Sequence, residues 1–550
     1  MSRPFVPGGR PRFAHQKEGL RDIIRRGGVS ALIFDPGTGK TATAIDYMGV
    51  LALGLNEPEV RVMVVCPLAA VDTWVYQMGE WISPEVNYWA EAIGGKLPQR
   101  AEALASRGGS PFKRQVSTGP VKSPGGPRTA HVGRSWALET KPKGVDPSRG
   151  PDAVPGPKVV LEVLNIDSLT SRRRVGGRNM SDIMLEAIKR FEPHLVVVDE
   201  SHKIKSVSGN ASRLLSRVTP HVRRRLILTG TLMPHGALDV FGQWRFLDPY
   251  AFGETLSNGS RRPATFSRFR ERYAKMGGYL GREVIGYRNL DELQDILAER
   301  ATVVRKEDAL DLPKTTDVVI PVELSPRETK VYAEMKKSLA ADLGNGDMVT
   351  VGSRLTQMMR LRQITSGHVP DDSGEVQEVG RSKVNTIRSL VQGTLAGENR
   401  VVVFCQFTHE IDALRESLRE SGTEVQVITG STPKEERLAM RKRFGSDAPG
   451  RIVLVAQITT MSLAVNELVT ASNAVFGSWT MKRDEYVQAR DRLNRLGQTR
   501  PVTFWHVLVP GTVDEVIYRS HQNRTNLETA VLRHIMGQEE DDLEALEESG

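Results

Sequence analysis

Short β-branched and apolar segments alternate with helix-like segments along most of this chain, in two separate stretches. The first stretch, from Val29 to Thr231, contains the strand candidates VSALIFD, VRVMVVCP, VVLEVLNID, HLVVVDE and RRLILTGT. The second begins at Arg400 and contains RVVVFCQF, EVQVITG, RIVLVAQ, NAVFGSW and VTFWHVLV. Nearly continuous apolar strands joined by helices are typical of parallel sheets covered by helices. The sequence therefore predicts two α/β domains in tandem.

The rest of the chain falls between and around these two stretches. The region between them is mostly helical in pattern, for example in SPRETKVYAEMKKSLAADL. Residues 108–158 are rich in Gly, Pro and Ser and hold nine Lys/Arg against three Asp/Glu, so we expect a mostly disordered, basic surface insertion. The predicted division is a first domain at 1–235, helical protrusions and an interdomain linker at 236–380, a second domain at 381–535 and an acidic tail at 536–550.

Charge and cysteine content narrow the class of protein. The 550 residues carry a formal charge of +9 and the pI is about 9.4, which favours a polyanionic partner such as nucleic acid over a neutral one. The two cysteines, Cys66 and Cys405, lie inside apolar strand-like runs and are predicted to be buried thiols of a reducing compartment. No apolar run approaches the length of about 18 residues that a membrane span requires, and the first residues lack a signal-peptide core. We expect a soluble cytoplasmic protein.

The segment DPGTGKT at Asp35–Thr41 has the composition of a phosphate-binding loop between a strand and a helix. Glycines let backbone N–H groups close around phosphate oxygens at a helix N-terminus. In such loops the lysine reaches the β- and γ-phosphates and the following hydroxyl binds Mg²⁺. Phe34 replaces the first glycine of the usual pattern, but the strand before the loop and the helix after it supply the expected context. The predicted nucleotide-binding residues here are Gly37, Thr38, Gly39, Lys40 and Thr41.

A second chemistry-bearing segment is LVVVDESHK, an apolar strand that ends in two carboxylates. Asp199 is predicted to enter the Mg²⁺ shell, and Glu200 to orient the attacking water. An acidic turn after a strand is common in α/β proteins. Here a phosphate-type loop precedes it in the sequence, and this favours the interpretation as a metal site. Thr41 and Asp199 are thus the predicted metal ligands, and a nucleotide and Mg²⁺ the predicted cofactors, with ATP as the nucleotide that the family resemblance described below implies.

Five motifs in this order, DPGTGKT, VVCPLAAVDTW, DESHKIKS, LTGTLMP and QARDRLNRLGQT, resemble the helicase motifs of superfamily two. More narrowly they are similar to those of the Swi/Snf-type DNA translocases, because of the lysines after the acidic box, TGT in the third motif and the ending RLGQT. MMRLRQITSG and GTVDEVI fit the same subgroup. The resemblance covers roughly residues 10–520. It implies two RecA-like parallel-sheet domains with helical insertions between them, and a nucleic-acid-dependent ATPase.

The resemblance also implies roles for single residues. Gln16 matches the glutamine that recognises adenine. Thr229 and Thr231 match the motif that couples the nucleotide to interdomain contacts. Gln488, Arg492 and Arg495 match Q-x-x-x-R-x-x-R, in which the arginines reach the γ-phosphate from the second domain. Helical spacing predicts that these three share one face.

DNA contacts in such motors lie mainly on the backbone, through loops at the ends of strands. The resemblance points to Pro67–Trp74 and Asn165–Leu169 in the first domain, and to Thr429–Thr432, Thr459–Thr460 and Asn466 in the second. Ser, Thr and Asn are also common in loops for turn reasons alone. The predicted nucleic-acid contacts are Pro67, Trp74, Asn165, Ser168, Thr229, Thr231, Thr429, Thr432, Thr460 and Asn466.

The main functional prediction is an ATP-dependent translocase on double-stranded DNA, with single strands less favoured and RNA disfavoured by the motif wording. A strand-separating or branch-migrating helicase is the first alternative, although no wedge element is evident. The second is a nucleotide-dependent binding switch, because TTMSLAVNEL lacks the glycines usual in the fifth motif before Asn466. No accessory chromatin module flanks the motor, so a prokaryotic or viral motor is expected.

Overall fold

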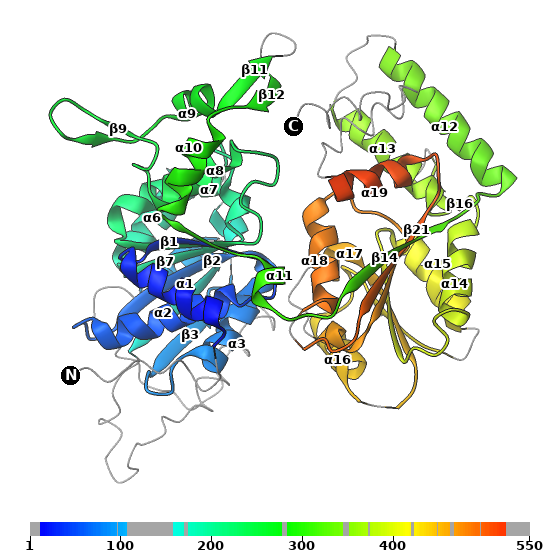
Figure 1. The fold of residues 1–550 in the computed structure, drawn as a ribbon, viewed down its shortest axis with the longest axis horizontal. Coiled ribbons are helices and arrows are strands. Elements are labelled where there is room, and N and C mark those ends of the chain that lie inside the picture. The colour runs from blue at the N-terminus through cyan, green and yellow to red at the C-terminus, as the bar shows by residue number, and fades with distance from the viewer. Residues whose placement is uncertain are drawn as a thin grey trace. The chain divides into compact units, whose positions relative to one another are not determined.

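The computed structural model divides into two compact units, Met1–Leu310 and Asp311–Gly550 (Figure 1). The acidic tail and nearly all of the predicted basic insertion lie outside the described residues. The structure describes residues 12–95, 97–106, 158–169, 174–175, 177–277, 283–344, 351–371, 374–419, 423–447, 449–461, 467–495 and 497–523.

The first unit is built on one parallel sheet of seven strands, in the order β13-β1-β8-β7-β2-β4-β3. The five strands predicted from apolar runs are all present, and the prediction of a parallel sheet is confirmed. The strands are β1 (Val29–Phe34), β2 (Val60–Cys66), β3 (Tyr88–Ala92), β4 (Val159–Asn165), β7 (Leu195–Asp199), β8 (Arg224–Thr229) and β13 (Ala301–Val304).

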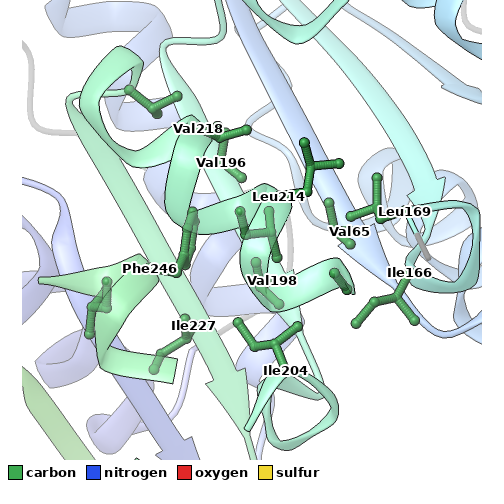
Figure 2. Close-up of a cluster of buried hydrophobic side chains, with 14 of the residues drawn as sticks. Val65, Ile166, Leu169, Val196, Val198, Ile204, Leu214, Val218, Ile227 and Phe246 are labelled. Atoms are coloured by element: carbon green, nitrogen blue, oxygen red, sulfur yellow. The ribbon is translucent and has the colours of Figure 1, made fainter. Parts of the chain in front are cut away.

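Helices cover both faces of this sheet, which explains why its strands are apolar on both sides. One buried cluster joins the sheet to α1–α3, and another joins it to α4 and α6–α8. Figure 2 shows part of the second cluster, where Val196 and Ile227 of the strands meet Leu214 and Phe246 of the helices. The helices are α1 (Ala14–Arg25), α2 (Lys40–Gly54), α3 (Val71–Trp81), α4 (Leu97–Ala105), α6 (Met180–Phe191), α7 (Asn210–Val218) and α8 (Asp239–Leu247).

Short elements extend from this core. Two antiparallel pairs, β9 with β10 and β11 with β12, flank helix α9, and α10 leads into the last strand of the sheet. Their bounds are β9 (Glu254–Thr255), β10 (Arg261–Arg262), α9 (Phe266–Tyr273), β11 (Ala274–Gly277), β12 (Glu283–Tyr287), α10 (Leu290–Ala298) and α11 (Lys306–Ala309). Elsewhere lie β5 (Arg174–Val175), β6 (Arg178–Asn179), and the 3-10 turns η1 (Leu68–Ala70), η3 (Ile166–Leu169), η4 (Ser201–Ile204) and η5 (Thr219–His221).

The second unit contains a parallel sheet of six strands in the order β14-β21-β20-β17-β19-β18. Helices α14 and α15 pack on one face, and α13, α18 and α19 on the other. The strands are β14 (Thr315–Pro321), β17 (Arg400–Cys405), β18 (Glu424–Ile428), β19 (Ile452–Gln457), β20 (Asn473–Phe476) and β21 (Val502–Leu508), with a separate hairpin of β15 (His368–Pro370) and β16 (Val376–Glu378). The helices are α12 (Pro326–Gly344), α13 (Val351–Thr365), α14 (Ser382–Gln392), α15 (Thr408–Arg419), α16 (Lys434–Gly445), α17 (Ile458–Met461), α18 (Arg483–Leu493) and α19 (Val513–Asn523), with the turn η7 (Glu467–Thr470).

The tandem arrangement of two parallel-sheet units confirms the predicted fold class. The segment predicted as helical protrusions and linker, 236–380, does contain helices α8–α13, but it also supplies one strand to each sheet. Those strands, β13 and β14, were not predicted, because β13 has only four residues and five of the seven residues of β14 are exposed. Cys66 and Cys405 are free and buried, as expected. Among the described residues, no helix has the length and apolar character needed to cross a membrane.

Candidate nucleotide and DNA sites

The predicted motifs of the first unit meet at one edge of its sheet. The carboxyl ends of parallel strands lie together, and ligands of open α/β sheets bind there. The phosphate-loop segment follows β1, Thr229 ends β8, and Asp199 ends β7. These strands are neighbours in the order β1-β8-β7, with β2 and its following Pro67 next in line. The sheet order therefore brings together residues up to about 190 positions apart in the sequence.

The loop after β1 has the backbone of a phosphate cradle. Gly37 and Gly39 have φ angles of 87° and 94°, in the left-handed region that favours glycine. A Cβ atom on Gly39 would lie 2.0 Å from Nε2 of Gln16. Helix α2 begins at the next residue, so its unpaired N–H groups face the loop. Both glycines are thus required by the fold of the loop itself.

Side chains of the loop lie close to its backbone. The Lys40 ammonium donates to the Phe34 carbonyl at 2.7 Å, and the Thr38 hydroxyl donates to the Asp35 carbonyl at 2.8 Å. Thr41 follows in the first turn of α2 and is half-buried. Lys40 and Thr41 therefore occupy the start of the helix, where a phosphate group and its cation would be held.

Gln16 lies against this loop, at the start of α1. Its amide nitrogen donates to the Thr38 carbonyl at 3.1 Å, and its amide oxygen accepts from the Phe13 backbone N–H at 3.2 Å. His15 Nε2 lies 2.8 Å from the same Thr38 carbonyl. Gln16 is buried, with 5% of its surface exposed. It therefore lies next to the nucleotide loop, in the place expected for a residue that recognises a base.

The acidic box at the end of β7 places two carboxylates side by side. Asp199 Oδ1 accepts the Glu200 backbone N–H at 3.0 Å, and Asp199 Oδ2 accepts the Trp74 indole N–H at 2.8 Å. Glu200 has a φ of 50°, uncommon for a residue other than glycine, and its Oε2 lies 3.3 Å from His202 Nδ1. Such a conformation is often found at functional sites.

The electrostatics of Asp199 fit a bound cation. Burial and, to a smaller extent, the charge of Glu200 raise the pKa of Asp199 to about 6, although the Trp74 hydrogen bond and the charge of Lys40 act in the opposite direction. A buried carboxylate beside a second one is stabilised in its charged form by a divalent ion. The set formed by the Thr41 hydroxyl, the Asp199 carboxylate, the Lys40 ammonium and the N-terminus of α2 therefore fits a magnesium nucleotide.

One residue that the sequence did not single out, Gln243 of α8, organises the segment after the acidic box. The Ser201 hydroxyl donates to its amide oxygen at 2.7 Å, and its amide nitrogen donates to the carbonyls of Leu232 and Asp239. At the neighbouring Gly242, a Cβ atom would lie 2.3 Å from the Lys205 carbonyl oxygen. Helix α8 therefore fixes η4 and the residues after β8 relative to each other.

Three residues predicted to contact nucleic acid are buried, and for them that prediction is corrected. Trp74 is 1% exposed and packs in the core with its N–H on Asp199. Thr229 is 0% exposed, and its hydroxyl donates to the Thr231 carbonyl at 2.9 Å. Thr460 is 8% exposed, and its hydroxyl donates to the Gln457 carbonyl at 2.7 Å. These side chains have internal partners and no free surface for a DNA strand.

The other predicted DNA contacts of the first unit lie in loops at the carboxyl edge. Pro67 and Asn165 are half-buried, and the Asn165 side chain accepts the Asp167 backbone N–H at 3.0 Å. Ser168 lies in the turn η3 that follows β4. Thr231 is half-buried just beyond β8. These loops therefore lie at the carboxyl edge of the sheet, as expected.

In the second unit, Thr429 and Thr432 form a turn at the carboxyl end of β18. The Thr432 hydroxyl accepts the Thr429 backbone N–H at 2.9 Å. Gln457 joins this turn to the neighbouring strand ends, since its oxygen accepts the Gly430 N–H at 3.0 Å and its nitrogen donates to the Gln406 carbonyl at 3.2 Å. Asn466 and half of the glycine-poor fifth motif lie outside the described residues.

Helix α18 carries the predicted arginine motif and ends at Leu493. Gln488 and Arg492 lie within it, but Arg495 lies beyond its end, so the helical spacing predicted for all three applies only to the first two. Arg490 is anchored: Nη2 lies 2.9 Å from Asp317 Oδ2, and the guanidinium stacks over Phe504 at 4.2 Å. Arg490 therefore has a structural partner set of its own.

The loop that carries Arg495 is held by Gln498, a residue of the ending RLGQT to which the sequence assigned no role of its own. Gln498 is 6% exposed; its nitrogen donates to the Ala471 carbonyl at 2.9 Å, and its oxygen accepts the N–H groups of Thr499 and Arg500. Burial lowers the pKa of Arg495, while Asp491 and Glu467 act to raise it. Gln498, in the ending GQT, thus holds the loop after α18 in place.

Comparison with models of known protein families identifies the family of this chain. Residues 164–368 match the model of the SNF2-related domain, and residues 382–497 match that of the helicase conserved C-terminal domain. The chain belongs to the Swi/Snf-type family of superfamily-two helicases. The family resemblance predicted from the ordered motifs is confirmed, and the enzyme class of this family, an ATP-hydrolysing helicase-type enzyme, agrees with the class predicted from them.

Individual relatives of this Swi/Snf-type chain are distant. The mouse DNA annealing helicase and endonuclease ZRANB3 is 23% identical over 92% of this chain and 39% of its own length. The zebrafish chromodomain-helicase-DNA-binding protein 1-like is 27% identical over 63% of this chain and 32% of its own. The chain thus spans well under half of these relatives. The SWI2/SNF2 ATPase core of Sulfolobus solfataricus in complex with dsDNA is 18% identical, with a TM-score of 0.36 over 96% of this chain and 94% of that chain.

Proposed function

We propose that this chain is an ATP-dependent motor that tracks on double-stranded DNA. The observation that carries the proposal is the meeting of the phosphate-type loop after β1 and the carboxylate pair after β7 at one sheet edge, in a chain of the Swi/Snf-type family. The relatives reported above are named as DNA-acting helicases, which supports DNA as the partner.

The predicted nucleotide-site residues of the first unit each have a role in the proposed function. The N–H groups at the start of α2 and the Lys40 ammonium bind the β- and γ-phosphates. Thr41 and Asp199 hold Mg²⁺, which when bound offsets phosphate charge. Glu200 orients the attacking water and accepts its proton, because its carboxylate lies next to Asp199 and is part-exposed. Gln16 binds adenine, exchanging its contact with the Thr38 carbonyl for the base.

In the second unit, Arg492 and Arg495 supply positive charge to the γ-phosphate in the transition state, with Gln488 assisting. Arginines in this role act on charge that develops during phosphoryl transfer. Support comes from Gln498, whose buried side chain fixes the loop that presents Arg495.

The residues proposed to contact DNA are those that lie in loops, and the buried residues are excluded. Backbone phosphates are contacted by the loops after β2, β4 and β18, which include Pro67, Asn165, Ser168, Thr429 and Thr432. Thr231 and Asn466 remain proposed contacts. Trp74, Thr229 and Thr460 are buried, and we do not propose that their side chains touch DNA. Phosphate contacts position a protein on DNA without reading its sequence, so we expect tracking with little sequence preference.

A second candidate function is strand annealing or branch migration, favoured by the likeness of 92% of this chain to a relative named a DNA annealing helicase. Both candidates need ATP hydrolysis and DNA. They differ in the DNA structure that stimulates turnover, duplex for the translocase and branched DNA for the alternative.

The test is steady-state ATP hydrolysis without nucleic acid and with single-stranded DNA, duplex DNA, a four-way junction or RNA, at one salt concentration because phosphate contacts are salt-dependent. We expect stimulation by duplex DNA and none in Lys40→Ala. Stimulation by junctions alone would favour branch migration. Stimulation by single strands or RNA alone would overturn the duplex assignment, and turnover that persists in Lys40→Ala would overturn the assigned site.

A further inference from the structure

The indole of Trp74 reaches the proposed magnesium ligand from the core of the first unit. Its N–H donates to Asp199 Oδ2 at 2.8 Å, and Trp74 and Asp199 are 1% and 8% exposed. The other carboxylate oxygen accepts the Glu200 backbone N–H at 3.0 Å. Each carboxylate oxygen has two lone-pair directions, so one remains on each for a cation or its water. The carboxylate is therefore held at both oxygens without being blocked.

Trp74 also belongs to the helix that begins at a proposed DNA loop. Strand β2 ends at Cys66, Pro67 and the turn η1 follow, and α3 starts at Val71. The buried face of α3 consists of Val71, Trp74, Val75 and Met78. One turn of helix thus separates the loop at the sheet edge from the indole that contacts Asp199. A shift of the loop moves the start of α3, and Trp74 lies in that first turn.

We infer that Trp74 is a positioning residue: its indole N–H orients the Asp199 carboxylate for Mg²⁺ and connects the loop after β2 to the cation site. The inference rests on the proposed function, because it takes Asp199 as the metal ligand and the loop as a DNA contact. Hydrogen-bond partners behind metal ligands change metal affinity by about 10–100-fold when removed. Their effect appears in the concentration of metal required, whereas a loss of packing appears in stability.

The chain offers a matched control in Trp244 of α8. Trp244 is 0% exposed and lies in the core of the same unit, and its indole nitrogen has no hydrogen-bond partner among the described residues. Trp74→Phe and Trp244→Phe therefore remove similar buried volume, but only the first removes a hydrogen bond to a carboxylate. Any effect common to both variants reports packing alone.

The experiment measures equilibrium binding of a fluorescent ATP analogue to the full chain while Mg²⁺ is titrated, with and without duplex DNA. We expect Trp74→Phe to raise the Mg²⁺ concentration for half-maximal nucleotide binding about 10-fold, and Trp244→Phe to leave it unchanged. We also expect any shift in this concentration that DNA produces in the wild type to be reduced in Trp74→Phe.

An unchanged Mg²⁺ requirement in Trp74→Phe, or equal shifts in both variants, would overturn the inference while leaving the proposed nucleotide site intact. A wild-type chain that binds nucleotide without any Mg²⁺ dependence would overturn the proposed function itself, and this inference with it. If Trp74→Phe does not fold, benzothienylalanine placed at position 74 keeps the size and shape of the indole without its N–H, and the same two outcomes apply.

Discussion

The side-chain oxygen of Gln243 accepts a hydrogen bond from the Ser201 hydroxyl at 2.7 Å, and both residues are 0% exposed. The amide nitrogen of Gln243 holds the Leu232 carbonyl at 2.8 Å. A single side chain therefore connects the residue after the acidic box with the segment after β8. These hydrogen bonds keep the two segments in a fixed relation to each other.

Replacing Gln243 by Leu should destabilise the first unit by about 2–4 kcal/mol, because several buried polar groups lose their partner at once. Denaturant unfolding monitored by circular dichroism measures the loss. The control is Gln99→Leu, since Gln99 is exposed on α4, and a surface change costs within about 0.5 kcal/mol. Equal stability of the two variants would contradict the role of Gln243.

Two glycines at helical positions should respond to alanine in opposite directions. At Gly242, a Cβ atom would meet the Lys205 carbonyl at 2.3 Å, so Gly242→Ala should lower the free energy of unfolding by about 1–3 kcal/mol. At Gly54 of α2, nothing lies within 4 Å of the added atom. Gly54→Ala should therefore be neutral or raise stability by up to about 1 kcal/mol. Comparing the two by thermal unfolding tests the close packing of α8 on η4; similar effects would refute it.

The arginines near the end of α18 should separate into structural and catalytic groups. Arg490→Lys loses the two-pronged contact with Asp317 and the stacking on Phe504, so it should lower stability by about 1–3 kcal/mol. Arg492→Ala and Arg495→Ala should reduce kcat at least 100-fold with little change in ATP affinity, because they act on transition-state charge. Turnover and nucleotide binding measured side by side decide between these roles. A loss of ATP affinity as large as the loss of kcat would mean that Arg492 and Arg495 are structural.

The second unit should lose stability as the pH falls from about 6.5 to about 4, partly through His521. Burial, together with the charges of Arg483 and Arg362, lowers the pKa of His521 to about 4, although the Thr480 carbonyl at 2.8 Å acts to raise it. Between these pH values the unfolded chain binds a proton that the folded chain excludes. The contribution of neutral His521 to the free energy of unfolding is therefore complete above about pH 6.5 and is lost as the pH falls toward 4.

His521→Gln is the variant that tests this, because its amide keeps a donor for the Thr480 carbonyl and does not titrate. The free energy of unfolding, measured across pH 4–7, should fall less steeply in the variant than in the wild type. Parallel curves would exclude His521 as the source of the acid sensitivity.

Most strands of the two sheets, and the glycine-containing loop after β1, were predictable because their signals are local. The strand VSALIF, the glycines at 37 and 39 and the helix from Lys40 are contiguous, and LVVVD ends in its carboxylate. Parallel pairing then brings Asp199 to the same edge without further information. The chemistry of the site therefore follows from short segments and one topological rule.

Gln243 and Gln498 were not predictable, because their roles depend on partners far away in the sequence or on loop geometry. Gln243 meets Ser201 across 42 positions and Gln498 meets Ala471 across 27. A glutamine in a helix or loop carries no local sign of such contacts.

Trp74 illustrates a prediction that the sequence could have improved. Its position after a strand-end loop suggested a DNA contact. However, Val71, Trp74, Val75 and Met78 follow the spacing of a buried helix face, and all four are buried. That periodicity favours a core position. Its contact with Asp199 still depends on the pairing of β2 with β7, which the sequence alone did not reveal.

The most direct test of the central claim is displacement of a labelled third strand from a DNA triplex, with ATP and the full chain. A motor that tracks on duplex DNA pushes the third strand off without separating the duplex. We predict displacement that requires ATP and Mg²⁺ and is absent in Lys40→Ala. Duplex-stimulated ATP hydrolysis with no displacement in either orientation of the triplex would contradict translocation.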